Sequence, residues 1–314
     1  RGHEVELSYW SESPANVPTV IERVRAEFPL HGHKDPHFLP KSLTGFDSAY
    51  FIKAGYNDGL LLPEANSLVH AVFGDFEPHG NRYVYISQWL AQSARRRHTF
   101  PSRGFLEARS RMRSARELGC QNATDFDYLD LIADIPPPNE DMRRRLNLPD
   151  DAFVILRFGG YDSFDIPWAH AEVVRALEES ERTYFIGLNT KPFVTHERAK
   201  FIPMVVDNQE KANLVSMGNV FLTARGEGEA FGVAIAEALQ LGIPVLAWSG
   251  GAYRNQTHML RGLGALYRSP RDLRSKLATL IRGVDPASVQ QRRQRGNLFR
   301  PEVIGPRLEQ LLRP

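Results

Sequence analysis

The stretch from residue 229 to residue 247, EAFGVAIAEALQLGIPVLA, constrains the fold more than any other part of the chain. Its middle is apolar almost all round, which predicts a buried helix that begins near residues 231–232. Gly242 is well placed to end this helix in a left-handed conformation. Residues 243–248 then predict a short buried parallel strand. A buried helix that leads directly into a buried strand is typical of an α/β fold with a parallel sheet.

Two glutamates of this stretch require an explanation. Glu237 lies on the buried helix, where a carboxylate is costly unless another group hydrogen-bonds it. Glu229 lies ahead of the helix start, where backbone N–H groups attract an anion. This arrangement suggests a nucleotide-sugar site, with a pyrophosphate at the helix start formed by Phe231, Gly232 and Val233. Glu237 then accepts from the ribose hydroxyls and Glu229 lies toward the sugar. The alternative is a buried βαβ segment whose two glutamates form ordinary salt bridges.

The motif Glu-x7-Glu containing Phe-Gly, followed by Glu-Ala and Gly-Ile-Pro-Val, resembles the signature of retaining GT-B glycosyltransferases, especially glycosyltransferase family 4 (group 1). The resemblance implies two Rossmann-like, doubly wound parallel-sheet domains that face a cleft. It also implies transfer of a hexose-type sugar from a GDP- or UDP-sugar to a glycan or lipid-linked acceptor, with retention of configuration, in polysaccharide biosynthesis. No metal or other cofactor is obligatory in this chemistry, in which the nucleotide sugar is a substrate.

A second phosphate-binding signal follows a predicted strand over residues 152–158. The strand ends in Arg157-Phe158-Gly159-Gly160. Paired glycines allow backbone to approach a phosphate, and an adjacent arginine can donate to its oxygens. Members of the family usually carry a lysine some four residues later, but this chain has Asp162 and Ser163 there, so Arg225 or Lys191 has to supply the second positive charge.

The resemblance also implies the role of each residue. Arg157, Arg225 and the helix start neutralise the departing diphosphate, while Glu229 binds sugar hydroxyls without acting as a covalent nucleophile. His70, in the predicted strand of residues 68–73, lines the face where the sugar reacts. The alternative for His70 is a core histidine with a satisfied ring.

Strands predicted at residues 5–9, 49–53, 68–73 and 83–87 alternate with helices, and residues 31–44 are predicted to form a long loop. The opening Arg-Gly-His-Glu-Val resembles the junction between the first helix and second strand of GT-B proteins, so we expect the first β-α unit of the N-terminal domain to be missing. The triple proline at 136–138 predicts a linker. We therefore expect an N-terminal, acceptor-side domain over residues 1–138 and a donor-binding domain over residues 139–314, whose last helix crosses back in many GT-B folds.

Composition and charge limit the classes of binding partner and the cellular compartment that we expect. A net charge of +2 in 314 residues gives no argument for nucleic acid, and no nucleic-acid-binding module is recognised. Cys120 is the only cysteine, and neither a membrane-spanning run nor a signal peptide is evident, which favours a cytoplasmic protein. The segment Arg95–Arg116 is rich in arginine and suits peripheral contact with anionic lipid at the inner face of a membrane, but a solvated helical surface explains it at least as well. Asp125-Phe126-Asp127 has the form of a GT-A metal motif in an unrelated context, so we expect no metal there.

Three rival functions remain at this stage. A GT-B-fold nucleotide-sugar epimerase shares the same binding residues. A non-catalytic GT-B scaffold that binds a nucleotide sugar is favoured by the missing lysine and the expected missing first strand. An NAD-dependent Rossmann enzyme is disfavoured, because the chain has no Gly-x-Gly-x-x-Gly turn.

Overall fold

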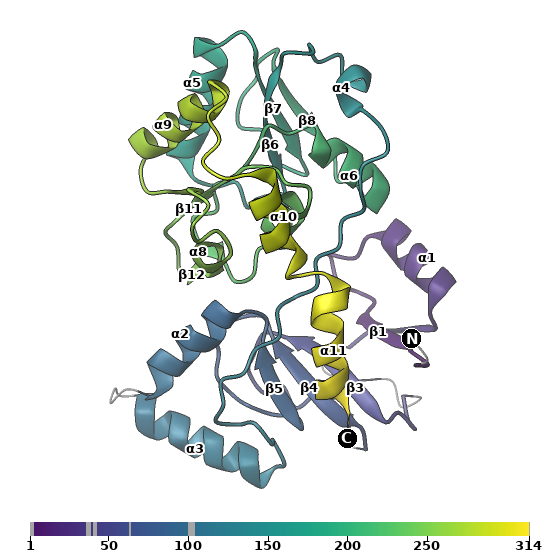
Figure 1. Ribbon diagram of the computed structural model, residues 1–314. Helices are drawn as coiled ribbons and strands as arrows, with labels where there is room; N and C mark the ends of the chain where they lie inside the picture. Colours follow the sequence, from purple (N-terminus) through teal and green to yellow (C-terminus); the bar gives the residue numbers. More distant parts are fainter. Residues whose placement is uncertain (1–2, 36–38, 40–42, 63, 100–103, 314) are drawn as a thin grey trace. The chain divides into compact units, whose positions relative to one another are not determined.

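The structure is a computed structural model that describes residues 3–35, 39, 43–62, 64–99 and 104–313 (Figure 1). The chain forms two compact units. Unit 1 consists of Arg1–Tyr85, Ala91–Asp127 and Leu308–Pro314, and unit 2 consists of Ile86–Leu90 and Tyr128–Arg307. The domain boundary expected after residue 138 stays a prediction. Compact units are segments that pack together, and they need not be the segments that fold as independent domains.

Unit 1 contains two small parallel sheets. One pairs β1 (Leu7–Trp10) with β2 (Leu30–His33), and α1 (Pro18–Glu27) connects them. The other has the order β3 (Ser48–Lys53), β4 (Asn66–Ala71), β5 (Arg82–Tyr85). Two arginine-rich helices follow, α2 (Gln88–Thr99) and α3 (Gly104–Glu117).

The predicted loop of residues 31–44 is wrong at its start, where β2 forms. Leu7 pairs with Leu30 and Trp10 pairs with His33, so backbone pairing with β1 creates this strand. The sequence Leu-His-Gly-His has no apolar alternation from which a strand could be predicted.

Unit 2 is built on a six-stranded, all-parallel sheet in the order β13-β11-β9-β6-β7-β8. The strands are β6 (Phe153–Phe158), β7 (Thr183–Leu188), β8 (Ala199–Ile202), β9 (Val220–Thr223), β11 (Val245–Trp248) and β13 (Leu266–Tyr267). A short parallel pair, β10 (Gly228–Glu229) with β12 (Tyr253–Arg254), lies outside this sheet. The helices are α4 (Met142–Arg145), α5 (Pro167–Glu179), α6 (Asn208–Ser216), α7 (Val233–Gln240), α8 (Asn255–Met259), α9 (Pro270–Ile281) and α10 (Val289–Asn297). The last helix, α11 (Pro301–Leu312), begins in unit 2 and ends in unit 1.

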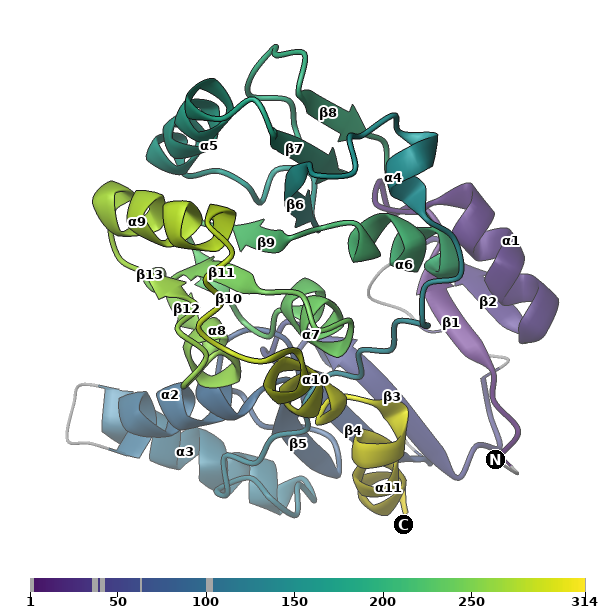
Figure 2. The same ribbon diagram turned by 45° about the horizontal axis from the view of Figure 1, so that its top comes forward.

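Helices cover both faces of the large sheet, with α5 and α9 on one face and α6 and α7 on the other (Figure 2). The core on the first face includes Ile155, Val173, Phe185, Leu222 and Leu277, all at most 2 % exposed. Because both faces are covered, the strands are mostly apolar, as parallel strands usually are. Arg157 near the end of β6 and Lys200 on β8 are the charged residues in these six strands.

The helix and strand predicted over residues 231–248 are confirmed. The helix α7 begins after Gly232, whose φ is 102°, and the chain leaves it at Gly242, whose φ is 80°. The N–H of Gly242 donates to Leu239 O at 2.9 Å, and the N–H of Ile243 donates to Ala238 O at 2.9 Å. This pair of bonds satisfies carbonyls at the end of the helix and turns the chain into β11.

Candidate active site

Arg157 lies near the carboxyl end of β6, where open parallel sheets bind ligands. Its side chain is buried, and Nη2 donates to Ser163 Oγ at 2.8 Å. Within the described part of the chain, its Nε atom is buried and has no hydrogen-bond partner. Burial lowers the pKa of Arg157 to about 10, against the opposing charge of Glu229, so the guanidinium stays positive at neutral pH. A buried cation with an unsatisfied donor is typical of a functional site.

Gly159 and Gly160 shape the loop that follows Arg157. Gly159 has φ of 143°, and a Cβ there would lie 2.6 Å from Arg157 Nη1. The carbonyl of Gly160 accepts from Ser163 Oγ at 2.8 Å. The first glycine therefore lets the loop lie against the guanidinium. The positions where a lysine was expected carry the Asp162 carboxylate and the Ser163 hydroxyl instead of a second positive charge.

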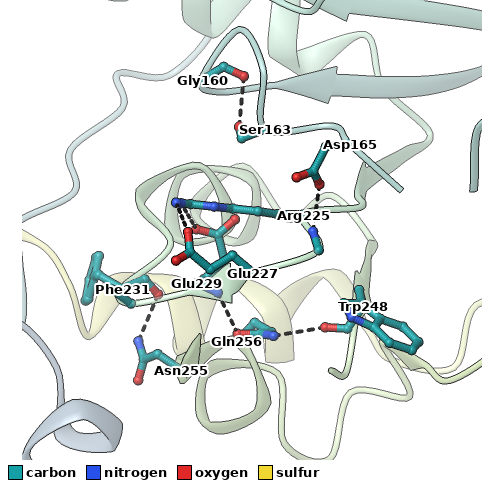
Figure 3. A network of polar contacts seen from close by, with 12 residues as sticks. Gly160, Ser163, Asp165, Arg225, Glu227, Glu229, Phe231, Trp248, Asn255 and Gln256 are labelled. Atoms are coloured by element: carbon teal, nitrogen blue, oxygen red, sulfur yellow. Dashed lines mark hydrogen bonds and ion pairs between the residues drawn. The ribbon is translucent and has the colours of Figure 1, made fainter. Parts of the chain in front are cut away.

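Arg225 links two carboxylates directly ahead of α7 (Figure 3). Its Nη2 lies 3.2 Å from Glu227 Oε2, and its Nη1 lies 3.5 Å from Glu229 Oε2. Asp165 holds the adjacent backbone, because its Oδ1 accepts from the N–H of Gly226 at 2.7 Å. Glu227 and Asp165 were not among the predicted site residues. Glu227 is only two residues from Glu229 in the sequence, and this closeness could have predicted that it belongs to the site.

The charges of this cluster act on Glu229. Burial raises the pKa of its carboxyl group, and the positive charges of Arg225 and Arg157 oppose that rise. The structure therefore brings together three of the four residues predicted to be catalytic, Arg157, Arg225 and Glu229, within unit 2.

The predicted phosphate-binding residues Phe231, Gly232 and Val233 form the start of α7. Phe231 is buried edge-on against Phe299, with ring centroids 5.3 Å apart, so it offers a ligand only its backbone. Val233, the first residue of the helix, is exposed. The helix start thus reaches the surface of unit 2, where its free N–H groups favour an anion.

Glu237 has the partner that its burial requires. Its Oε1 accepts from Lys211 Nζ of α6 at 2.6 Å. Burial raises the pKa of the Glu237 carboxyl group, and Lys211 opposes the shift. Lys211 was not predicted, since it lies 26 residues from Glu237 and outside the motif. The predicted role of Glu237 at a ribose stays a prediction.

Lys191 is exposed beside the Gly159–Ser163 loop. Its N–H donates to Tyr161 O at 3.1 Å, and its Nζ lies 3.6 Å from Asp162 Oδ1. Its charge is therefore offset by a neighbouring carboxylate.

His70 belongs to unit 1, where it lies on β4 and is 1 % exposed. Its Nδ1 is 2.6 Å from the hydroxyl of Tyr50 on β3. This contact gives the ring a structural partner, and the predicted role at the reacting sugar stays a prediction.

The arginine-rich segment Arg95–Arg116 falls on α2 and α3, with residues 100–103 outside the described residues. Acidic neighbours offset part of its charge, as Arg111 pairs with Glu107 at 2.7 Å and Arg113 pairs with Glu117 at 3.0 Å. Contact with a membrane surface stays a prediction. None of the helices described is long and apolar enough to span a membrane. In the same described ranges, no group of three or more histidine, cysteine or acidic side chains is placed to hold a metal ion.

The sequence matches no family model, and no curated protein matches it either. Solved structures do match. Alr3699/HepE from Anabaena, in complex with UDP and glucose, aligns with a TM-score of 0.60 at 13 % identity over 98 % of this chain and 98 % of its own. A glycosyltransferase from Rickettsia africae ESF-5 aligns with a TM-score of 0.54 at 13 % identity over 96 % and 83 %. Sucrose-phosphate synthase from Thermosynechococcus elongatus aligns with a TM-score of 0.51 at 17 % identity over 78 % and 72 %. The predicted fold is therefore confirmed: the chain has the GT-B fold, built from two Rossmann-like α/β domains.

Proposed function

We propose that this protein is a retaining glycosyltransferase similar to glycosyltransferase family 4. It transfers a hexose-type sugar from a GDP- or UDP-sugar to a glycan or lipid-linked acceptor in polysaccharide biosynthesis, without a metal. The observation that carries this proposal is the cluster of Arg157, Arg225 and Glu229. It lies where the parallel sheet ends and α7 begins, and such an edge is where open α/β sheets bind ligands.

The two arginines suit the stabilisation of a leaving group. When the bond between the anomeric carbon and the phosphate oxygen breaks, negative charge develops on the diphosphate. Arg157, Arg225 and the N-terminus of α7 offset this charge. The acceptor oxygen bonds to the anomeric carbon on the face that the diphosphate leaves, and its proton passes to the departing phosphate oxygen.

Arg225 has to exchange a partner in this mechanism. It lies within 3.5 Å of both Glu227 and Glu229, so a bound phosphate competes with one of these carboxylates. Release of Glu229 frees its carboxylate to accept from sugar hydroxyls. Glu237 accepts from the ribose through the carboxylate oxygen that Lys211 does not bind.

A non-catalytic nucleotide-sugar-binding protein is the second candidate. The observation that favours it is the balance of charge, since Arg225 is paired with two carboxylates, and Asp162 and Ser163 stand where a second cation is expected. A protein with this balance binds a donor but stabilises its departing diphosphate less well.

Binding and turnover separate the two candidates. The first experiment compares the thermal unfolding of the protein with UDP, GDP, ADP and CMP, starting from UDP because HepE was solved with UDP and glucose. The second measures hydrolysis and transfer with the sugar nucleotides of the base that binds. Turnover that Glu229→Gln abolishes supports the glycosyltransferase. Selective binding without turnover supports the second candidate, and no binding of any nucleotide overturns both.

A further inference from the structure

Residues 229–231, which precede Gly232 and α7, are each held by a side chain from another part of unit 2. Gln256 Oε1 accepts from the N–H of Glu229 at 3.1 Å. Ser87 Oγ donates to the carbonyl of Ala230 at 2.7 Å, and Asn255 Nδ2 donates to the carbonyl of Phe231 at 2.8 Å. Figure 3 shows the bonds from Asn255 and Gln256. Glu229 also pairs with Arg254 in the short β10–β12 ladder, whereas Ala230 and Phe231 lie between β10 and α7, where side chains supply hydrogen-bond partners.

These side chains are buried, so their hydrogen bonds are costly to break. Ser87, Asn255 and Gln256 are 0 %, 3 % and 1 % exposed, respectively. A buried polar group that loses its partner cannot replace it with water. Each bond therefore holds the loop in one position.

Gln256 also ties Glu229 to the loop that follows β11. Its Nε2 donates to Trp248 O at 2.9 Å (Figure 3). The same Nε2 donates to Gly250 O at 3.2 Å. One amide group thereby connects three backbone groups, at the end of β10, at the end of β11 and in the loop after β11. A shift of any of these segments costs at least one of these bonds.

The neighbouring backbone leaves the loop little room to adjust. A Cβ on Gly228, whose φ is 80°, would lie 1.8 Å from Tyr253 O. A Cβ on Gly251, whose φ is 100°, would lie 2.4 Å from Glu227 O. The N–H of Tyr253 donates to that same Glu227 carbonyl at 2.9 Å. Residues 227–228 and 251–253 are therefore in direct backbone contact. Glu229 is held by this contact on one side and by Gln256 on the other.

We propose that Gln256, supported by Asn255 and Ser87, is a positioning residue that holds the Glu229 carboxylate in the geometry needed for sugar transfer. This inference rests on the proposed function. Gln256 acts through Glu229, and an error of about 1 Å in the position of such a group costs on the order of 100-fold in rate.

Gln240 provides a matched control. It is also buried, and it also makes three hydrogen bonds to backbone, with Ile135 N at 3.2 Å, Ala133 O at 2.7 Å and Gly296 O at 3.2 Å. Gln256→Met and Gln240→Met remove the same side-chain amide and the same number of bonds. They differ in the backbone that is left without its partner.

The experiment measures kcat, donor KM, UDP affinity and Tm for both variants. We expect a similar loss of Tm in both variants and a fall in kcat of about 10- to 100-fold in Gln256→Met alone. The UDP affinity of Gln256→Met should stay within about twofold of the wild type, because in the proposed function Glu229 contacts the sugar and not the nucleotide. An equal kcat in the two variants overturns the inference. A loss of UDP affinity in Gln256→Met as large as its loss of kcat also overturns it.

Hydrogen exchange at the Glu229 amide separates a failure of this inference from a failure of the proposed function. We expect protection in the wild type and in Gln240→Met, and weaker protection in Gln256→Met, where the pairing of β10 with β12 remains but the bond to Gln256 is lost. If the wild type turns over no sugar nucleotide, the proposed function fails, while this pattern of exchange still supports Gln256 as the anchor of the loop. Unchanged protection in Gln256→Met overturns the anchor itself.

Discussion

Glu229 and Glu237 belong to one motif but lie in two different environments. Glu229, the last residue of β10, is 19 % exposed in its side chain and lies 3.5 Å from Arg225, and the charge of Arg157 also acts on it. Glu237, on α7 itself, is 7 % exposed and accepts from Lys211 Nζ at 2.6 Å. Burial raises the pKa of both carboxyl groups, and positive neighbours oppose the rise in both cases.

The difference lies in how readily each carboxylate can change partner. Arg225 approaches Glu229 only to 3.5 Å and is shared with Glu227, so a ligand can take over this contact at little cost. Lys211 holds Glu237 by a short, mostly buried bond, and breaking it leaves a buried carboxylate without its cation. We infer that Glu229 is the glutamate that responds to the substrate and Glu237 is the one that stays fixed.

The strongest test of this comparison is Glu229→Gln, which keeps the size of the side chain and removes its charge. We expect kcat/KM for a sugar nucleotide to fall about 10²- to 10³-fold, the usual effect of removing one group that stabilises the transition state. Glu227→Gln is the matched control, since Glu227 contacts the same Arg225 at 3.2 Å. An equal loss of kcat/KM in both variants would show that the charge around Arg225 matters and that Glu229 has no separate role.

Lys211→Met tests the other half of the comparison, the claim that Glu237 is held fixed by Lys211. We expect the free energy of unfolding to fall by about 1–3 kcal/mol at pH 7, less than for a fully buried pair because the Lys211 side chain is 23 % exposed. Without Lys211, only burial acts on the Glu237 carboxyl group and its pKa rises further above the ordinary 4.5. The folded protein then binds a proton that the unfolded chain releases, so stability is retained at pH 4.5 and decreases as pH rises through the folded-state pKa.

Urea unfolding of wild type and Lys211→Met at several pH values between 4.5 and 7.5 measures this effect. Lys191→Met is the control, since its partner Asp162 is exposed. A destabilisation that does not change with pH would show that Glu237 is not the group left uncompensated.

Local signals in the sequence predicted the parts of this site that are local in structure. The apolar run and Gly242 were sufficient for α7, because a helix and its left-handed end depend on neighbouring residues. Lys211 and Gln256 were not predicted, since they reach Glu237 and Glu229 from 26 and 27 residues away. Only tertiary packing makes these pairs, and no spacing within the motif signals them.

Glu237→Gln should have a smaller effect than either change above. The amide still accepts from Lys211 but loses its charge, so we expect nucleotide affinity to fall about 10-fold if Glu237 accepts from the ribose, the usual worth of one charge-assisted hydrogen bond. The corresponding 2′-deoxynucleotide is the control ligand. If Glu237 contacts the ribose 2′-hydroxyl, the wild type should bind it more weakly and the variant should discriminate less. Equal discrimination by both proteins would remove Glu237 from contact with that hydroxyl.

Lys191→Ala should have the smallest effect. The Lys191 and Asp162 side chains are 68 % and 77 % exposed and their charged atoms are 3.6 Å apart, so we expect the free energy of unfolding to change by less than about 0.5 kcal/mol. Nucleotide diphosphate affinity then isolates the predicted role of Lys191 as the second cation. If Lys191 supplies this charge, the variant binds UDP or GDP several-fold more weakly at low salt and Asp162→Ala binds more tightly, because the lysine is released from its carboxylate. Unchanged affinity in both variants would leave Arg157 and Arg225 as the cations of the site, and the loop that carries Lys191 would then have no part in holding the diphosphate.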